Sequence, residues 1–230
     1  IYPMERHAPY LREMGLTRWR FGARNTDTVS IHPDKEEICQ DPCVDGNLEK
    51  LASLAQEAER CERCELHRTR DKVVFGSGAP AVRWLFVGEA PGAEEDKQGL
   101  PFVGRAGALL GAMLTSIGLS REDVYIANVL KCRPPNNRDP FGQEVRECSP
   151  FLHKQIDLVQ PTVIVAMGRF AAQVLLSSDQ SLGQLRGSAH TFGEISVPLV
   201  VTYHPAYLLR SPAAKSKTWE DLLLAKSLLV

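Results

Sequence analysis

The spacing of four cysteines is the feature that most constrains how this chain can fold. Two residues separate Cys61 from Cys64, and fifteen separate Cys132 from Cys148 much further along the chain. A close pair plus two distant cysteines is typical of chains that join far-apart segments at one thiolate-bound metal centre. Disulfide bonds are the alternative, but small secreted scaffolds have dense cysteines and a thin core, unlike this chain. The spacing therefore favours a metal site.

The bulk composition predicts one globular domain with no general affinity for polyanions. The chain has 230 residues, is 43% hydrophobic and carries a formal net charge of -1, so any DNA affinity must come from local basic clusters. It has no apolar run of eighteen residues and no signal-peptide pattern. We therefore expect a cytoplasmic protein with reduced thiols, no membrane association, no obligate protein partner and a monomeric state.

The sequence predicts an N-terminal extension, residues 1–46, and a folded core domain, residues 47–230. Met4 is a candidate natural start, which makes residues 1–3 a remnant of cloning. Residues 10–21 have an amphipathic pattern that predicts a short helix, and residues 22–46 are polar and rich in turn residues. Cys39 and Cys43 lie in this extension; they are expected to be free thiols, and a second metal site is the alternative.

Four apolar segments in the second part alternate with amphipathic helices. The segments predicted as strands are 83–87, 124–129, 162–167 and 197–202; the predicted helices are 48–61, 109–117, 143–158 and 219–229. Continuously apolar strands separated by helices are typical of parallel sheets covered on both faces. The sequence predicts an α/β three-layer sandwich with a central, mostly parallel four-stranded sheet flanked by helices.

Three unusual segments follow these strands: residues 88–92, 131–138 and 203–210. Ligands of such sheets bind beyond the carboxyl ends of the strands, so the three segments are expected to form one pocket. Glu89 can orient water there, although its segment can also be a plain turn. Asn128 pairs a donor with an acceptor that can read a pyrimidine edge, or it bonds a neighbouring loop.

Phe102 lies in a loop, where its ring is either a core plug or a stacking platform for a base. His204, held by Pro205, can donate a hydrogen bond to developing negative charge, although a single histidine is often structural. The leucines of Leu208-Leu209-Arg210 either tuck inward or wedge into stacked DNA bases. Further basic residues, either a phosphate-binding rim or a solvated face, are Arg105, Lys131, Arg133 and Arg138.

Four motifs together resemble the family 4 uracil-DNA glycosylases, the iron–sulfur branch of that superfamily. The motifs are Gly88-Glu89-Ala90-Pro91-Gly92, residues 101–107 (PFVGRAG), Asn128 ahead of Lys131-Cys132-Arg133-Pro134, and residues 204–210 (HPAYLLR). The resemblance runs from about Leu48 to the C-terminus. It implies a uracil-DNA glycosylase-like fold and a [4Fe-4S] cluster, structural in role, on Cys61, Cys64, Cys132 and Cys148.

The resemblance also implies an activity: the enzyme flips uracil out of DNA and hydrolyses its N-glycosidic bond, leaving an abasic site and free uracil. Glu89 then acts near the attacking water and His204 bonds the departing base. Phe102 stacks on uracil, and Asn128 reads its edge. Backbone contacts to the base come from Gly88, Ala90 and Pro91, and DNA contacts from Arg105, Leu208, Leu209 and Arg210.

Two departures separate the chain from a sister branch that traps uracil covalently. That branch carries Gln after the motif Glu and a histidine in a basic insertion, whereas Ala90 follows Glu89 here and residues 133–137 contain no histidine. We therefore expect this chain to release uracil and turn over rather than to trap it covalently. The competing function classes are a non-catalytic DNA-binding module with a structural metal and a nucleotide-binding α/β enzyme, although no Gly-x-Gly-x-x-Gly or P-loop motif occurs.

Overall fold

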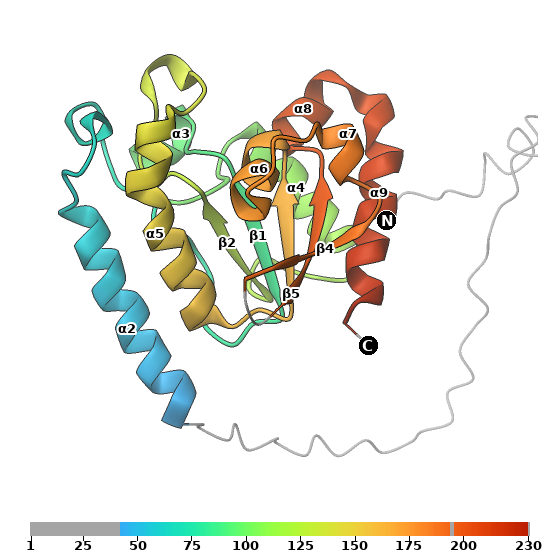
Figure 1. Ribbon diagram of the computed structural model, residues 1–230, viewed down its shortest axis with the longest axis horizontal. Helices are drawn as coiled ribbons and strands as arrows, with labels where there is room; N and C mark the ends of the chain where they lie inside the picture. The colour runs from blue at the N-terminus through green and yellow to red at the C-terminus, as the bar shows by residue number, and fades with distance from the viewer. Residues whose placement is uncertain (1–41, 194–195, 230) are drawn as a thin grey trace, which may run out of the picture. The chain divides into compact units, whose positions relative to one another are not determined.

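The computed structural model describes residues 42–193 and 196–229, which are organised around one five-stranded sheet (Figure 1). The strands are β1 Trp84–Gly88, β2 Val124–Asn128, β3 Val163–Met167, β4 Ala189–Phe192 and β5 Val197–Thr202. Their order is β2-β1-β3-β5-β4, and every neighbouring pair is parallel except β4 with β5. The order reverses direction around β1 and β3, so the loops after β1, β2 and β5 meet at one edge of the sheet.

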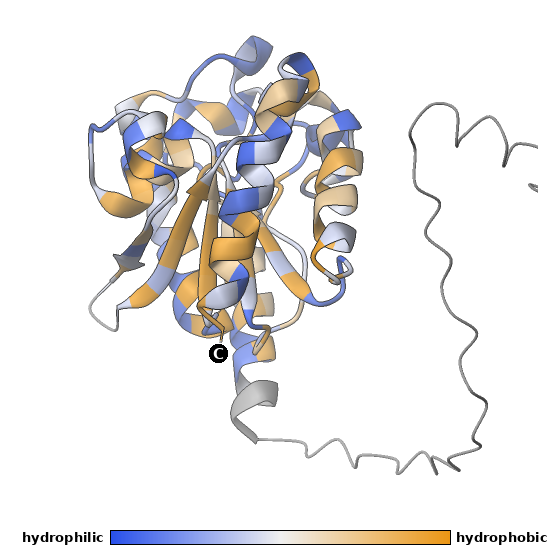
Figure 2. Cartoon of the chain, turned by 90° about the vertical axis from the view of Figure 1, so that its right-hand side faces the viewer, coloured by the Kyte–Doolittle hydropathy of each residue, from blue (hydrophilic) through white to orange (hydrophobic). Residues whose placement is uncertain are grey.

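Side chains of each parallel strand alternate between two hydrophobic cores. Leu85 and Val87 of β1 pack in one core with α5 Gly142–Val159 and α6 Arg169–Leu176, and α2 Pro42–Glu59 lies outside α5 (Figure 1). Trp84 and Phe86 pack in the other core with α4 Arg105–Ser116 and α9 Lys215–Ser227. Figure 2 shows the central strands coloured mainly as hydrophobic between helices that carry hydrophilic stretches. Burial on both faces explains why these strands are continuously apolar.

Short elements follow the strands at the carboxyl edge of the sheet. Helix α3 (Ala93–Gln98) follows β1, the 3-10 turn η3 (Pro135–Asn137) follows β2, and α8 (Pro205–Arg210) follows β5. The remaining short elements are η2 Glu65–Arg68, α7 Leu182–Leu185 and η4 Pro212–Ala214. The site segments are thus brought together by sheet topology.

The predicted α/β class is confirmed, and the four predicted strands are present within one residue of their predicted ends. The structure adds β4, a short antiparallel edge strand whose residues alternate between exposed and half-buried. Helix α2 begins at Pro42, five residues before the predicted catalytic domain, and includes Cys43. Cys39 and the helix predicted at residues 10–21 lie outside the described residues. The division after residue 46 stays a prediction.

None of the helices formed by residues 42–193 and 196–229 has the length and apolarity needed to cross a membrane.

Candidate active site

A cavity of about 460 Å³ opens at the carboxyl edge of the sheet. It is bordered by residues that follow β1, β2 and β5, as the sequence predicted. The predicted site residues that line it are Glu89, Ala90, Pro91, Phe102, Asn128, His204 and Arg210. Residues from four separate parts of the chain therefore face one volume.

Asn128 ends β2 and presents an unsatisfied amide to this cavity. Asn128 is only 2% exposed, and its side-chain Oδ1 has no hydrogen-bond partner within the described part of the chain. Buried amide oxygens are nearly always bonded, so an orphaned one at a cavity wall is a strong indication of a ligand. The alternative that Asn128 bonds a neighbouring loop is not seen for this atom.

Phe102 forms a rigid, recessed wall of the cavity. Phe102 is 5% exposed and adopts a left-handed backbone conformation with φ 53°. Arg121 fixes the loop by donating hydrogen bonds from Nη1 to the Phe102 carbonyl oxygen at 2.9 Å and from Nη2 to the Pro101 carbonyl oxygen at 2.7 Å. Gly107 must lack a side chain, because a Cβ there would lie 1.8 Å from the Phe102 carbonyl oxygen.

Glu95 holds the other side of the same loop. Its Oε1 accepts hydrogen bonds from the backbone N–H groups of Val103 at 3.0 Å and Gly104 at 3.1 Å. The carboxylate also borders the cavity. The sequence does not reveal this role, because the acidic run at residues 94–96 gives no sign of which carboxylate turns inward.

His204 is oriented as a neutral hydrogen-bond donor. It caps α8, and its Nδ1 accepts a hydrogen bond from the Ala206 backbone N–H at 3.2 Å, which leaves the proton of the neutral ring on Nε2. Burial, and secondarily the charge of Arg210, lowers the pKa of His204 to about 4, against a smaller opposing effect of Glu95. The ring lies 5.5 Å from that of Phe102, centroid to centroid, at an interplanar angle of 34°.

Glu89 follows β1 and is only partly exposed. Burial raises the pKa of its carboxyl group, the negative charge of Asp139 raises it further, and the charge of Arg169 opposes both effects. A carboxylate with a raised pKa accepts a proton, or a hydrogen bond from water, more readily than an exposed one. The residue is thus suited to orient a water molecule at the cavity.

The structure corrects two members of the predicted DNA-contacting set. Leu208 is 1% exposed and packs in the core behind α8, so it tucks inward while Leu209 remains 38% exposed. Lys131 is also buried, and its Nζ donates to the Asn128 carbonyl oxygen at 2.7 Å, so it is no part of a solvent-facing rim. Tyr207, which the sequence analysis missed, lines the cavity and is 40% exposed.

The other predicted basic residues differ in how free they are. Arg105 is exposed at the start of α4 but does not line the cavity. Arg138 lines it, yet its guanidinium is held by the Glu144 carboxylate at 2.6 Å. Its guanidinium also lies over the ring of Phe141, at 3.7 Å from the centroid. Arg138 is therefore partly committed to shaping the loop before α5.

The four predicted metal-binding cysteines line a second, smaller cavity between the segment after α2, the loop after β2 and helix α5. Cys61, Cys64, Cys132 and Cys148 are all free thiols, so the disulfide alternative is not seen among them. Arg70 Nη1 donates to Cys132 Sγ and the Lys131 backbone N–H to Cys148 Sγ, both at 3.2 Å. Such N–H donors commonly surround metal-bound sulfur.

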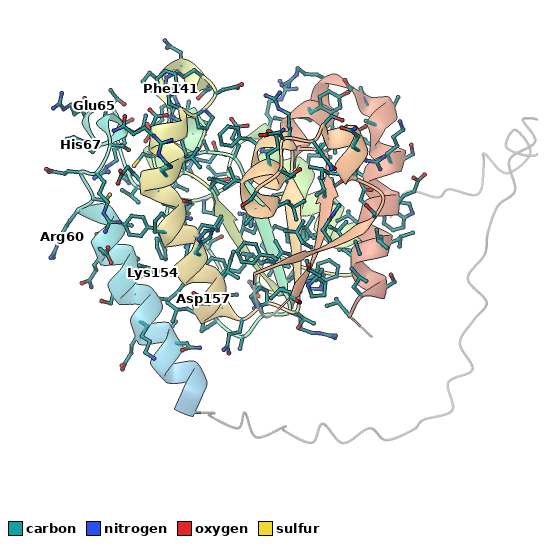
Figure 3. The ribbon with its side chains drawn as sticks, in the orientation of Figure 1. Arg60, Glu65, His67, Phe141, Lys154 and Asp157 are labelled. Carbon is teal, nitrogen blue, oxygen red and sulfur yellow. The ribbon has the colours of Figure 1, made fainter. Side chains whose placement is uncertain are left out.

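Figure 3 labels Glu65 and His67 in the short turn η2, which follows Cys64, and Phe141 at the N-cap of α5. No group of three or more His, Cys, Asp or Glu side chains in the described residues is arranged to hold a metal ion. The all-thiol donor set and its N–H donors fit a cluster with four cysteine ligands.

Comparisons with known proteins identify the family of this chain. The family model described as Uracil DNA glycosylase superfamily matches residues 75–223, so the fold and cavity define a member of that class. A type-4 uracil-DNA glycosylase of Archaeoglobus fulgidus is 44% identical over 181 residues, covering 76% of this chain and 90% of the relative. A type-4 uracil-DNA glycosylase of Thermotoga maritima is 46% identical over 167 residues, covering 70% of this chain and 85% of the relative.

A further type-4 uracil-DNA glycosylase, of Pyrobaculum aerophilum, is 42% identical over 165 residues, covering 69% of this chain and 84% of the relative. Identities of 42–46% over most of both chains assign the protein to one branch of the superfamily. The chain belongs to the type-4 uracil-DNA glycosylases. The resemblance drawn from the four motifs is confirmed.

Proposed function

We propose that the chain extrudes uracil from DNA into the cavity between Phe102, Asn128 and His204 and hydrolyses its N-glycosidic bond there. The activity follows from the family: the chain is a uracil-DNA glycosylase, a hydrolase of base excision repair. The observation that carries the residue roles is the orphaned, buried Oδ1 of Asn128 in this cavity. The products are an abasic site and free uracil.

The cavity wall matches the edge and face of a uracil base. Uracil presents an N–H donor beside a carbonyl acceptor, and the amide of Asn128 offers the complementary acceptor and donor. The ring of Phe102 supplies a planar surface for the base, as aromatic side chains do in enzymes that flip nucleotides. Ala90 and Pro91 border the same cavity and, with Gly88 before them, supply the backbone contacts to the base in this proposal.

The chemistry requires support for negative charge on the departing base. As the glycosidic bond breaks, the electron pair moves to the uracil ring and positive charge develops on the sugar. The neutral Nε2–H of His204 donates a hydrogen bond to that ring, a preorganised electrostatic stabilisation that needs no strong acid. Glu89 orients the water that attacks the sugar carbon and accepts its proton.

Uracil-containing DNA is the partner that the exposed rim accommodates. Arg210 on α8 is exposed and lines the cavity, and Leu209 on α8 and Arg105 on α4 are exposed; these three residues serve as the DNA contacts. No part in DNA contact is assigned to the buried Leu208. We place the protein in the cytoplasm, where the four cysteines stay reduced and able to bind metal.

A [4Fe-4S] cluster on Cys61, Cys64, Cys132 and Cys148 completes the proposal. When bound, it supplies a structural cross-link rather than electrons to the reaction. The four thiols tie the segment after α2 and helix α5 to the loop after β2, which also carries residues of the uracil cavity. A Cys132→Ser variant should lose bound iron and the broad visible absorbance of the purified protein; full iron content would exclude Cys132 as a ligand.

The substitution His204→Ala tests the catalytic proposal. Single-turnover excision of uracil from a labelled oligonucleotide, read as strand breakage after alkali, should slow by roughly a hundredfold or more. DNA affinity should change little, because His204 acts on the departing base. His153→Ala, an exposed histidine on α5, is the matched control. Equal rates for His204→Ala and wild type would refute the role, and DNA binding by wild type without abasic sites would favour the non-catalytic alternative.

A further inference from the structure

Helix α8 presents its residues in two opposite directions. Leu208 is buried at 1% exposure, whereas Tyr207 at 40% and Leu209 at 38% face outward. We propose that Tyr207 is a stacking platform for the DNA base next to the extruded deoxyuridine, and that the Arg186–Asp221 ion pair holds this platform in place through Tyr203. The proposal rests on the proposed uracil excision and adds a base-binding site to it.

Tyr207 is tied to the catalytic histidine and borders the same cavity. Its backbone N–H donates to the His204 carbonyl oxygen at 2.9 Å in the first turn of α8. A strand that delivers one nucleotide into the cavity must place the adjacent nucleotides at its rim, because one backbone repeat separates them. The exposed Tyr207 side chain lies where such a neighbouring base is delivered.

The Tyr207 ring is supported by a second aromatic ring. Tyr203 and Tyr207 are stacked with centroids 5.1 Å apart and an interplanar angle of 16°. The guanidinium carbon of Arg186 lies 5.0 Å from the centroid of the Tyr203 ring, within the range of a cation–π contact. Arg186 and Tyr203 thus restrict the exposed ring from the protein side.

Arg186 is itself fixed by a buried carboxylate. Its Nε donates to Asp221 Oδ2 at 3.1 Å and its Nη2 to Asp221 Oδ1 at 2.9 Å, a bidentate pair. Nη2 also donates to the Lys217 carbonyl oxygen at 2.7 Å. The two side chains are 13% and 1% exposed. A planar guanidinium held at several points cannot reorient, so it keeps the stacked rings preorganised.

A nucleobase is the ligand that suits this surface. An exposed ring with a supported inner side offers a planar surface to any base, whatever its sequence, and base–aromatic stacking is a common element of DNA-strand binding. Arg210 lines the same cavity and supplies a cation for the phosphate that links the extruded nucleotide to its neighbour. Aromatic ring and cation therefore match adjoining parts of one strand.

The test measures affinity for an oligonucleotide that carries 2′-fluoro-deoxyuridine, which resists hydrolysis. Tyr207→Ala should raise the Kd by roughly tenfold, whereas Tyr207→Phe, which keeps the ring, should bind like wild type. Trp219→Ala is the matched control, since Trp219 is 42% exposed but lines a different groove. Inhibition by free uracil should be the same in all four proteins, because the uracil cavity itself is intact.

A double-mutant cycle tests the supporting pair. Arg186→Lys breaks the bidentate contact and should raise the Kd by a few-fold, but it should add almost nothing to Tyr207→Ala, because both act on the same stacked base. A purely structural defect would instead add its full effect in the double variant. Additive effects would overturn the positioning role of Arg186.

The outcomes separate this proposal from the proposed function. Wild-type DNA affinity in Tyr207→Ala, with uracil excision intact in the wild-type protein, would overturn the stacking site alone. Absence of excision in the wild-type protein would instead refute the proposed function. Two further oligonucleotides carry 2-aminopurine on the 5′ or the 3′ side of the uracil. In one of the two, wild-type binding should change the 2-aminopurine fluorescence, and Tyr207→Ala should lose this change. No fluorescence change in either oligonucleotide would also contradict the proposal.

Discussion

Gly88 and Asn128 are register partners at the ends of neighbouring parallel strands, and there is no room for a side chain between them. A Cβ on Gly88 would lie 2.4 Å from Asn128 Oδ1 and 2.7 Å from Cζ of Phe102. The amide proposed to read uracil and the ring proposed to stack on it therefore both pack against bare backbone. The register of β1 with β2 sets their spacing.

Gly88→Ala should damage the uracil site more than the fold. The added methyl group must displace the Asn128 amide or the Phe102 ring, at a cost of about 1–3 kcal/mol in the free energy of unfolding. Uracil excision should fall by at least roughly tenfold, since a displaced donor or acceptor no longer meets the base. The measurements are single-turnover excision and urea unfolding.

Gly111→Ala is the matched control for Gly88→Ala. Gly111 lies inside α4 and a Cβ there meets nothing within 4 Å, so the change should stabilise the fold by roughly 0.5–1 kcal/mol and leave excision unchanged. Excision at the wild-type rate in Gly88→Ala would show that the close packing of Gly88 does not constrain the site.

The pH dependence of excision should report the carboxyl group of Glu89. If ionised Glu89 orients the water, kcat/KM falls as pH decreases through its raised pKa. Asp139→Asn removes a charge that raises this pKa, so the acid limb should move to lower pH. Arg169→Gln removes a charge that lowers it, so the limb should move to higher pH. Acid limbs that coincide in pH for the wild type and both variants would exclude Glu89 as the titrating group.

His204 should not contribute a second inflection in that profile. Its pKa lies near 4, so the ring stays neutral and able to donate from Nε2 throughout the range in which an exposed histidine titrates. Because the folded pKa is below the unfolded value, the unfolded chain binds a proton first as pH decreases. Its contribution to stability is therefore complete above about pH 6.5 and is lost as pH decreases toward 4.

The elements that follow strong local rules could be predicted from the sequence. Buried parallel strands are continuously apolar, so the sequence located the four parallel strands β1, β2, β3 and β5. The rule that ligands bind at the carboxyl ends of such strands predicted the position of the cavity. Strand β4 lacks this pattern because its residues are exposed or half-buried at the sheet edge. It forms by pairing with β5, a long-range contact without a local signal.

Side-chain direction was the part of the site that the sequence could not supply. Tyr207, Leu208 and Leu209 are consecutive on one turn of helix, and only packing against the core decides that Leu208 points inward. Lys131 looks like a surface cation in sequence, but a buried Gln155 and the Asn128 carbonyl oxygen bind its ammonium group. Such partners lie in other elements, so spacing along the chain does not predict them.

Arg70 should protect the cluster proposed to bind at Cys61, Cys64, Cys132 and Cys148. Its guanidinium donates to Cys132 Sγ and to the carbonyl oxygens of Cys61 and Glu59. Arg70→Met removes these bonds, and the visible absorbance should be lost about tenfold faster in air-saturated buffer, as expected for a residue that supports metal ligands. Arg68→Met is the control, because Arg68 is exposed and pairs only with Glu65 in the described residues. Equal bleaching rates in the two variants would contradict a protective role.

Glu95 should act on uracil through the loop that carries Phe102. Its carboxylate is the acceptor for the Val103 and Gly104 N–H groups, so Glu95→Ala leaves two donors unpaired and should cost about 1–3 kcal/mol of stability. With the loop released, the inhibition constant of free uracil should rise by roughly tenfold, because the base loses a preformed stacking surface. Glu95→Gln keeps one acceptor oxygen and should recover part of the effect.

The neighbouring Glu94 separates this positioning role from charge. Glu94 is exposed and pairs with Lys97, so Glu94→Ala removes a negative charge from the same short helix and leaves the two hydrogen bonds from the loop to Glu95 in place. Its inhibition by uracil should equal that of wild type. The comparison is made on folded protein, at a temperature where both variants keep their circular dichroism. If Glu95→Ala were inhibited by uracil as strongly as Glu94→Ala, the Phe102 loop would hold its shape without the carboxylate, and the two N–H bonds would have no part in base binding.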